Sequence, residues 1–149
     1  MRLVVQRVAF SDVKVDNEVV GKIDKGFMVL LGVTHEDTKE NADFLAKKLC
    51  NLRVFEDENE KMNLSLKDVC GELLVVSQFT LYGDCRKGRR PSFSSAARPE
   101  LATKLYEEFI EKAKKEGIVT KTGKFGAHMM VDLTNDGPVT ILLESNRDF

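Results

Sequence analysis

Short apolar runs separated by polar turns divide the first half of the chain into predicted strands. Residues 3–10 predict a first strand, and residues 13–15 and 19–23 predict a hairpin. Residues 27–33 are apolar almost throughout and predict a central strand. Residues 73–76 are four β-formers in a row, which indicates a further strand that is buried on both faces.

Helical spacing of apolar residues predicts two helices. Asp37 can cap the first helix with Glu40 three residues later, as in a capping box. Apolar residues then recur at helical intervals through residues 42–52. The second predicted helix spans residues 99–116, because a proline suits its first turn and Gly117 suits its end.

The rest of the chain predicts three more strands. Residues 53–55 form a short candidate. Residues 127–133 and 139–144 form two longer ones, and turn-forming residues at 134–138 predict a tight turn between them.

Composition and charge narrow the class of protein. The chain has 149 residues, 42% hydrophobic and 32% charged, which fits one soluble globular domain over residues 1–149. The formal net charge of −1 does not indicate general nucleic-acid binding. No apolar run reaches the roughly 20 residues of a membrane helix. Three cysteines without disulfide or metal spacing indicate a reducing, cytoplasmic compartment.

The stretch from Ser77 to Asp84 is the first candidate site. It continues a buried apolar strand and turns polar, so a rigid element would hold its polar groups in place. The alternative is a strand that runs into an ordinary surface loop. The Thr80 hydroxyl is a conceivable nucleophile, although no general base lies nearby in the sequence.

The segment after this stretch is strongly basic. Residues 85–98 contain five basic residues and no acidic one: Arg86, Lys87, Arg89, Arg90 and Arg98. Such a segment suits a phosphate backbone, and a solvated surface loop is the alternative.

Familiar catalytic and metal-binding patterns are missing from the sequence. His35 and His128 lie far apart without a cluster of cysteines or carboxylates. The nucleophile elbow, the phosphate-binding glycine loop and the dinucleotide fingerprint are also absent. We therefore expect neither a metal nor a cofactor.

Two long motifs resemble those of the D-aminoacyl-tRNA deacylase family. The first is SQFTLYGD at residues 77–84 with RKGRRPSF at residues 86–93, and the second is NDGPVT at residues 135–140. Shorter matches surround them, at residues 6–8, 51–53, 61–63 and 123–127. The resemblance covers essentially residues 1–144. One departure is Gly83, where the family often has alanine.

The resemblance implies a fold, a partner and a substrate. The fold is α+β, a β-barrel-like mixed sheet with two main helices packed against it, and the protein is a homodimer. The substrate is tRNA charged with a D-amino acid, and glycyl-tRNA(Ala) is also accepted. Gly137 and Pro138 form a Gly-cis-Pro element that enters the partner subunit's pocket and sterically excludes L-amino acids.

The resemblance also implies roles for individual residues. The backbone N–H groups of Phe79 and Thr80 lie near the ester carbonyl, and the 2′-hydroxyl of the terminal adenosine assists hydrolysis. The residues expected near the substrate are Ser77, Gln78, Gly137, Pro138, Met129 and Arg7. Arg7 can brace the Gly-Pro turn, and Met129 is equally a core residue. From charge alone, we expect tRNA phosphates to approach Arg86, Lys87, Arg89 and Arg90.

Two other classes of function stay open on the sequence. One is an esterase in which the Thr80 hydroxyl attacks the substrate. The other is a non-catalytic RNA-binding module that uses the basic segment.

Overall fold

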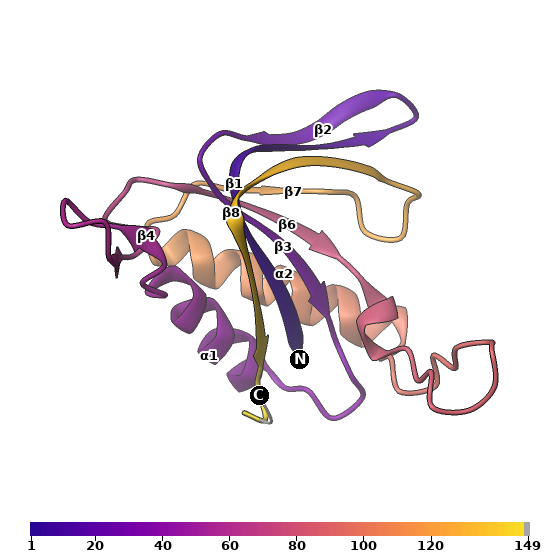
Figure 1. The fold of residues 1–149 in the computed structure, drawn as a ribbon. Coiled ribbons are helices and arrows are strands. Elements are labelled where there is room, and N and C mark those ends of the chain that lie inside the picture. Colours follow the sequence, from indigo (N-terminus) through magenta and orange to yellow (C-terminus); the bar gives the residue numbers. More distant parts are fainter. Residues whose placement is uncertain (148–149) are drawn as a thin grey trace.

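A computed structural model describes residues 1–147 of the chain (Figure 1). Its main sheet has the strand order β2-β1-β3-β6-β7, and β8 pairs with β1. The strands of this sheet are β1 (Arg2–Val15), β2 (Glu18–Ile23), β3 (Gly26–Gly32), β6 (Glu72–Ser77), β7 (Thr120–Thr122) and β8 (Met130–Glu144). A small hairpin of β4 (Phe55–Glu56) and β5 (Met62–Leu64) lies apart from it.

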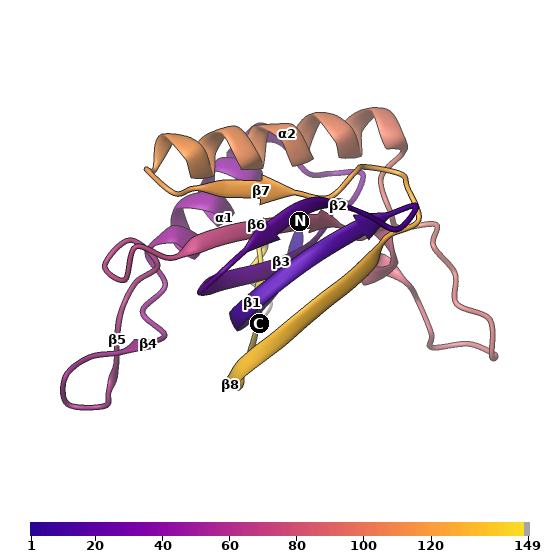
Figure 2. The ribbon, with the colours of Figure 1, turned by 90° about the horizontal axis from the view of Figure 1, so that it is seen from above.

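Two helices cover one face of the sheet, α1 (Lys39–Cys50) and α2 (Pro99–Lys115) (Figures 1 and 2). Both faces of the central strands are buried, and successive residues point alternately to one face and to the other. Phe27 of β3 and Leu73 of β6 pack beneath the helices, whereas Met28 and Leu74 point into the interior of the curved sheet. This two-sided burial explains why β3 and β6 are almost continuously apolar.

The sheet curls into a nearly closed barrel because β2 returns towards β7. A Cβ atom on Gly21 of β2 would lie 2.4 Å from the Thr122 carbonyl oxygen of β7. Only glycine permits such a close approach between backbones. The expected barrel-like sheet with two main helices is therefore confirmed, and both antiparallel and parallel pairs occur in it.

The predicted start of the first helix is wrong. Thr38 is the N-cap, and its backbone N–H donates to Asn41 Oδ1 at 2.8 Å. Asp37 is buried instead, where it accepts hydrogen bonds from the Thr34 backbone N–H and from the Met1 amine. The Met1 amine, which is distant in sequence, thus binds the carboxylate that the local pattern assigned to the helix cap. The second helix begins at Pro99 as predicted and ends before Gly117.

The tight turn predicted at residues 134–138 is also wrong. Both halves of β8 pair antiparallel with β1, so the chain does not reverse there. Gln6 pairs with Thr140 and Val8 with Asn135, which leaves residues 136–139 bulging opposite Arg7 alone. The Gly137–Pro138 peptide bond in this bulge is cis. Turn-forming residues suit a bulge as well as a reversal, and only the partner strand distinguishes the two.

Several boundaries differ from the sequence-based prediction. The strands predicted at residues 3–10 and 13–15 are one continuous strand, β1. The strand predicted at residues 53–55 is β4, at Phe55–Glu56. The short strand β7 and the 3-10 helix η1 (Phe79–Tyr82) were not predicted.

Within residues 1–147, none of the helices is both long and apolar enough to cross a membrane.

Candidate active site

A pocket of about 250 Å³ lies where β6 ends. Ser77, Gln78 and Phe79 form one wall at the start of η1, and Phe125 and Met129 approach from the chain between β7 and β8. The other lining residues are mostly apolar, so the pocket suits a flat or apolar group with a few polar contacts.

Two backbone N–H groups at the start of η1 take no part in the hydrogen bonds of that helix. Its first i→i+3 hydrogen bond runs from the Leu81 N–H to the Gln78 carbonyl oxygen, at 3.3 Å. The N–H groups of Phe79 and Thr80 precede that bond and have no partner within the helix. The start of the 3-10 helix therefore has two adjacent backbone donors outside its own hydrogen bonds, and Phe79, which carries the first of them, lines the pocket.

The Thr80 side chain has a partner that cannot act as a base. Gln78 Nε2 donates a hydrogen bond to Thr80 Oγ1, and an amide nitrogen does not accept a proton at neutral pH. Thr80 does not line the pocket, although its neighbours in η1 and β6 do.

One titratable side chain lines the described pocket, that of Tyr106 on α2. Its hydroxyl donates to the Val75 carbonyl oxygen at 2.8 Å, and burial raises the pKa of this phenol to about 12. The tyrosine is therefore engaged in structure and stays protonated near neutral pH. Among residues 1–147, no three His, Cys, Asp or Glu side chains are grouped as metal ligands.

Met129 lies between the pocket and the barrel interior. It lines the pocket and packs against the inner barrel cluster. A Cβ atom on Gly123 would lie 2.6 Å from Met129 Sδ, so the thioether rests on the Gly123 backbone. The sequence left open whether Met129 is a core residue or a pocket residue, and in the structure its side chain has both positions at once.

Arg7, Gly137 and Pro138 lie elsewhere in the protomer. Of residues 1–147, those that line the pocket include none of these three. Gly137 and Pro138 are exposed in the bulge of β8, whereas Arg7 is buried beneath it. Arg7 Nε donates to the Asp136 carbonyl oxygen at 2.8 Å, which ties the bulge to β1.

Two further residues hold this arrangement, and the sequence did not single them out. Glu56 accepts from Arg7 Nη1 at 2.9 Å, and the guanidinium lowers the pKa of the Glu56 carboxyl. Asn135 closes the bulge: its Oδ1 accepts from the Val139 N–H at 2.8 Å, and its Nδ2 donates to the Val139 carbonyl oxygen at 3.0 Å. Asn135 lies within the NDGPVT motif, which was the available signal.

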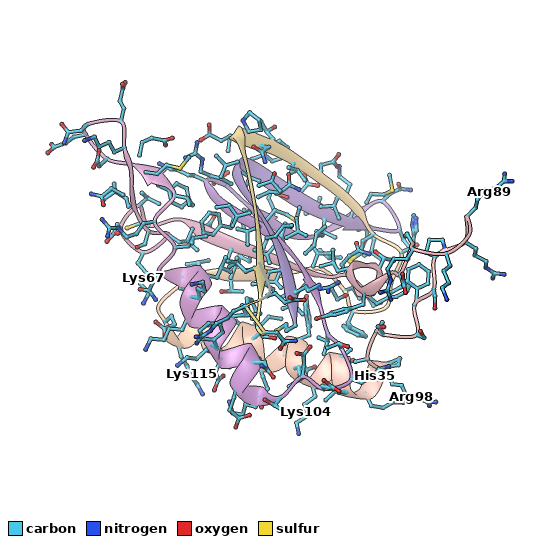
Figure 3. The ribbon with its side chains drawn as sticks, turned by 60° about the horizontal axis from the view of Figure 1, so that its bottom comes forward. His35, Lys67, Arg89, Arg98, Lys104 and Lys115 are labelled. Carbon is cyan, nitrogen blue, oxygen red and sulfur yellow. The ribbon has the colours of Figure 1, made fainter. Side chains whose placement is uncertain are left out.

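The basic segment forms a loop that projects beyond η1 (Figures 1 and 2). Asp84 and Ser92 pair at its base as an antiparallel bridge. Asp84 also accepts from Arg86 at 2.7 Å, and this guanidinium holds the pKa of the Asp84 carboxyl well below its usual range. Arg86 is therefore neutralised locally, while Lys87, Arg89 and Arg90 are exposed, with Arg89 pointing away from the fold in Figure 3.

Comparison with known proteins places the chain in a family. The family model described as D-Tyr-tRNA(Tyr) deacylase matches residues 4–144. A D-aminoacyl-tRNA deacylase of Clostridioides difficile (strain 630) is 67% identical over the full length of both chains. One of Thermosipho africanus (strain TCF52B) is 60% identical, again over both full chains.

Solved structures share the fold. One, described as c-Myc DNA Unwinding Element Binding Protein, superposes with a TM-score of 0.91 at 45% identity and covers 97% of this chain and 98% of its own. Another, a probable eukaryotic D-amino acid tRNA deacylase, has a TM-score of 0.81 at 19% identity over 96% and 98% of the two chains, which shows the fold alone.

The fold and the pocket are those of a barrel-like α+β protein whose site opens at a strand end. The chain belongs to the D-Tyr-tRNA(Tyr) deacylase family.

Proposed function

We propose that this chain hydrolyses the ester bond between a D-amino acid and the 3′ end of tRNA, and that it also accepts glycyl-tRNA(Ala). The names of its full-length relatives and its membership of the family support the part of this proposal that concerns D-aminoacyl-tRNA. The products are free tRNA and free amino acid. The activity belongs in the cytoplasm, where aminoacyl-tRNA is made and used.

The observation that carries the proposal is the chemistry of the pocket wall. Among residues 1–147, those that line the pocket include no carboxylate, imidazole or thiol. Backbone groups are therefore the main polar groups that the pocket offers to a substrate. The N–H groups of Phe79 and Thr80 suit an ester oxygen that becomes negative as water attacks the carbonyl carbon. The 2′-hydroxyl of the terminal adenosine, held near Ser77 and Gln78, assists the attack. The bond from the carbonyl carbon to the 3′ oxygen then breaks.

Chirality is selected by exclusion in a homodimer. Gly137 and Pro138 are exposed, and they lie outside the pocket of their own protomer. In the dimer, Gly137 and Pro138 of the partner subunit enter the pocket. Their carbonyl groups hold the substrate's α-amino group, and the bulge occupies the space that an L side chain needs. Selectivity then needs no contact with the D side chain.

The exposed cations of the basic loop approach the tRNA. Lys87, Arg89 and Arg90 attract phosphates, and Arg86 contributes less because Asp84 neutralises it. Binding of tRNA is therefore expected to weaken as salt is raised.

Deacylation of D- and L-tyrosyl-tRNA, run in parallel with EDTA present, tests this function. We expect release of D-tyrosine alone. Equal release of both tyrosines would exclude the chirality gate and favour a general esterase. Salt-sensitive tRNA binding without release of either would leave only an RNA-binding module.

The Thr80 esterase has its own test, Thr80→Ala alongside Thr80→Ser. If Thr80 only shapes η1, both variants keep most of the D-tyrosyl-tRNA hydrolysis. Loss of turnover in Thr80→Ala with retention in Thr80→Ser would assign the attack to the hydroxyl.

A further inference from the structure

Two exposed aromatic rings stand together where the pocket meets the basic loop. Phe79 is 57% exposed and Phe93 is 40% exposed. Their ring centroids are 5.2 Å apart and their planes make an angle of 74°, an edge-to-face pair. Phe79 also lines the pocket, so the pair continues the pocket wall outwards. A pair of aromatic rings exposed to water beside a pocket indicates a binding surface for a ligand or a macromolecule.

The fold supports the outer ring from below. The bridge between Asp84 and Ser92 closes the base of the basic loop and brings Phe93 back beside η1. A Cβ atom on Gly83 would lie 3.0 Å from Phe93 Cε1, so the ring rests on the Gly83 backbone. Phe93 is thus held in place on one side and exposed on the other.

Positive charge adjoins the rings. Residues 85–98 contain no acidic side chain, and Lys87, Arg89 and Arg90 are exposed on the loop that joins η1 to Phe93. Single-stranded nucleic acids are bound by this combination, because bases stack on aromatic rings while cations follow the phosphates. Every nucleotide carries a phosphate, so several cations beside exposed rings fit a nucleic-acid strand better than a protein partner.

We propose that Phe79 and Phe93 form a stacking platform for the unpaired nucleotides that precede the terminal adenosine of the tRNA. Lys87, Arg89 and Arg90 contact the phosphates of the same strand. This inference rests on the proposed function, in which the pocket takes the aminoacylated terminal nucleoside. The single-stranded 3′ end would then run from the pocket, across the rings, to the basic loop.

The first test is binding of a 5′-fluorescein-labelled single-stranded RNA hexamer that ends in CCA, followed by fluorescence anisotropy at fixed salt. Phe93→Ala is expected to weaken binding roughly 5- to 100-fold, the range for one lost base–aromatic contact. Phe93→Tyr keeps a ring and is expected to bind like the unmodified protein. Met62→Ala is the matched control, because Met62 is 53% exposed on β5, at the end of the fold away from the basic loop (Figure 2).

Three outcomes would overturn the platform. Binding by Phe93→Ala within twofold of the unmodified protein would show that no base stacks there. Equal weakening by Met62→Ala would show a non-specific effect. A change of oligomeric state in Phe93→Ala but not in Phe93→Tyr, measured by sedimentation, would assign the rings to an interface between protomers.

A second readout separates this inference from the proposed function. D-tyrosyl-adenosine lacks the preceding nucleotides, so Phe93→Ala should lower kcat/KM for D-tyrosyl-tRNA by a factor at least about fivefold larger than for D-tyrosyl-adenosine. Equal factors would overturn the platform while leaving the hydrolase intact. RNA binding that depends on Phe93, without hydrolysis of either ester by the unmodified protein, would overturn the proposed function while leaving the platform intact.

Discussion

Arg7 Nε donates to the Asp136 carbonyl oxygen at 2.8 Å, which fixes the residue before Gly137 to the middle of β1. The same guanidinium donates to the Val54 carbonyl oxygen at 2.6 Å and to Glu56 at 2.9 Å. Arg7 is only 4% exposed, so its geometry is determined by these partners and not by solvent. The exposed Gly-Pro bulge is therefore presented from a rigid support.

Replacement of Arg7 by lysine is expected to loosen this support. Lysine keeps the charge but offers a single ammonium group, which cannot reach the Asp136, Val54 and Glu56 acceptors in the geometry of a guanidinium. We expect kcat/KM for D-tyrosyl-tRNA to fall by about 10- to 100-fold, as for small misplacements of a positioning group. Kinetics with both tyrosine enantiomers would measure the loss and any change in discrimination. An unchanged kcat/KM would show that the Arg7 contacts do not position the bulge.

Gly137→Ala is expected to distort the bulge itself. A Cβ atom there would lie 2.5 Å from the Val139 backbone nitrogen, so the backbone must shift. We expect D-tyrosyl-tRNA hydrolysis to fall at least about tenfold, or L-tyrosyl-tRNA hydrolysis to appear, because the distorted bulge would no longer fit the pocket that we propose it enters in the partner subunit.

Gly117→Ala is the control for that prediction. Gly117 has a φ of +88° but nothing lies within 4 Å of its Cβ position, and it follows α2. Its substitution should cost about 1–2 kcal/mol of stability, because an L-residue is strained at this left-handed φ, and should leave the ratio of D to L hydrolysis as it was. A parallel change in both variants would indicate general destabilisation.

The Arg7–Glu56 pair is expected to make the free energy of unfolding depend on pH in the acid range. The Arg7 guanidinium lowers the pKa of Glu56 in the folded protein. A lowered folded pKa means that the pair stabilises the fold above the unfolded pKa of about 4.3 and that this contribution is lost as pH falls through the folded pKa. Urea unfolding at pH 7 and pH 3 should therefore show a smaller acid loss in Glu56→Gln. An identical acid loss in both proteins would remove Glu56 as a source of the pH dependence.

The three thiols are expected to differ in reactivity. Cys50, the last residue of α1, is buried in the core and its burial raises its pKa to about 11, whereas Cys70 and Cys85 are exposed. Because the thiolate is the reactive form, a thiol reagent at pH 8 should modify two cysteines in the native protein and the third only after unfolding. Rapid modification of Cys50 in the native state would show that the helix layer opens readily.

The sequence by itself determined the local elements and the family motifs. Continuous apolar runs placed β3 and β6, and Pro99 and Gly117 placed the ends of α2, because these signals act between near neighbours. The motifs at residues 77–93 and 135–140 drew attention to both the pocket wall and the Gly-Pro bulge.

Only the tertiary structure decided how these pieces combine. Residues 134–138 have the composition of a reversal, but β1 pairs with both flanking segments and makes them one strand. Asp37 is a residue type that often caps helices, but its carboxylate accepts hydrogen bonds from the Met1 amine and the Thr34 backbone N–H instead. The pairing of Phe79 with Phe93 likewise depends on the bridge at the base of the basic loop. The β8 bulge depends on β1 and the position of Asp37 depends on Met1, and both partners lie far along the chain. A local pattern cannot specify such partners, because long-range pairing is set by the packing of the whole fold.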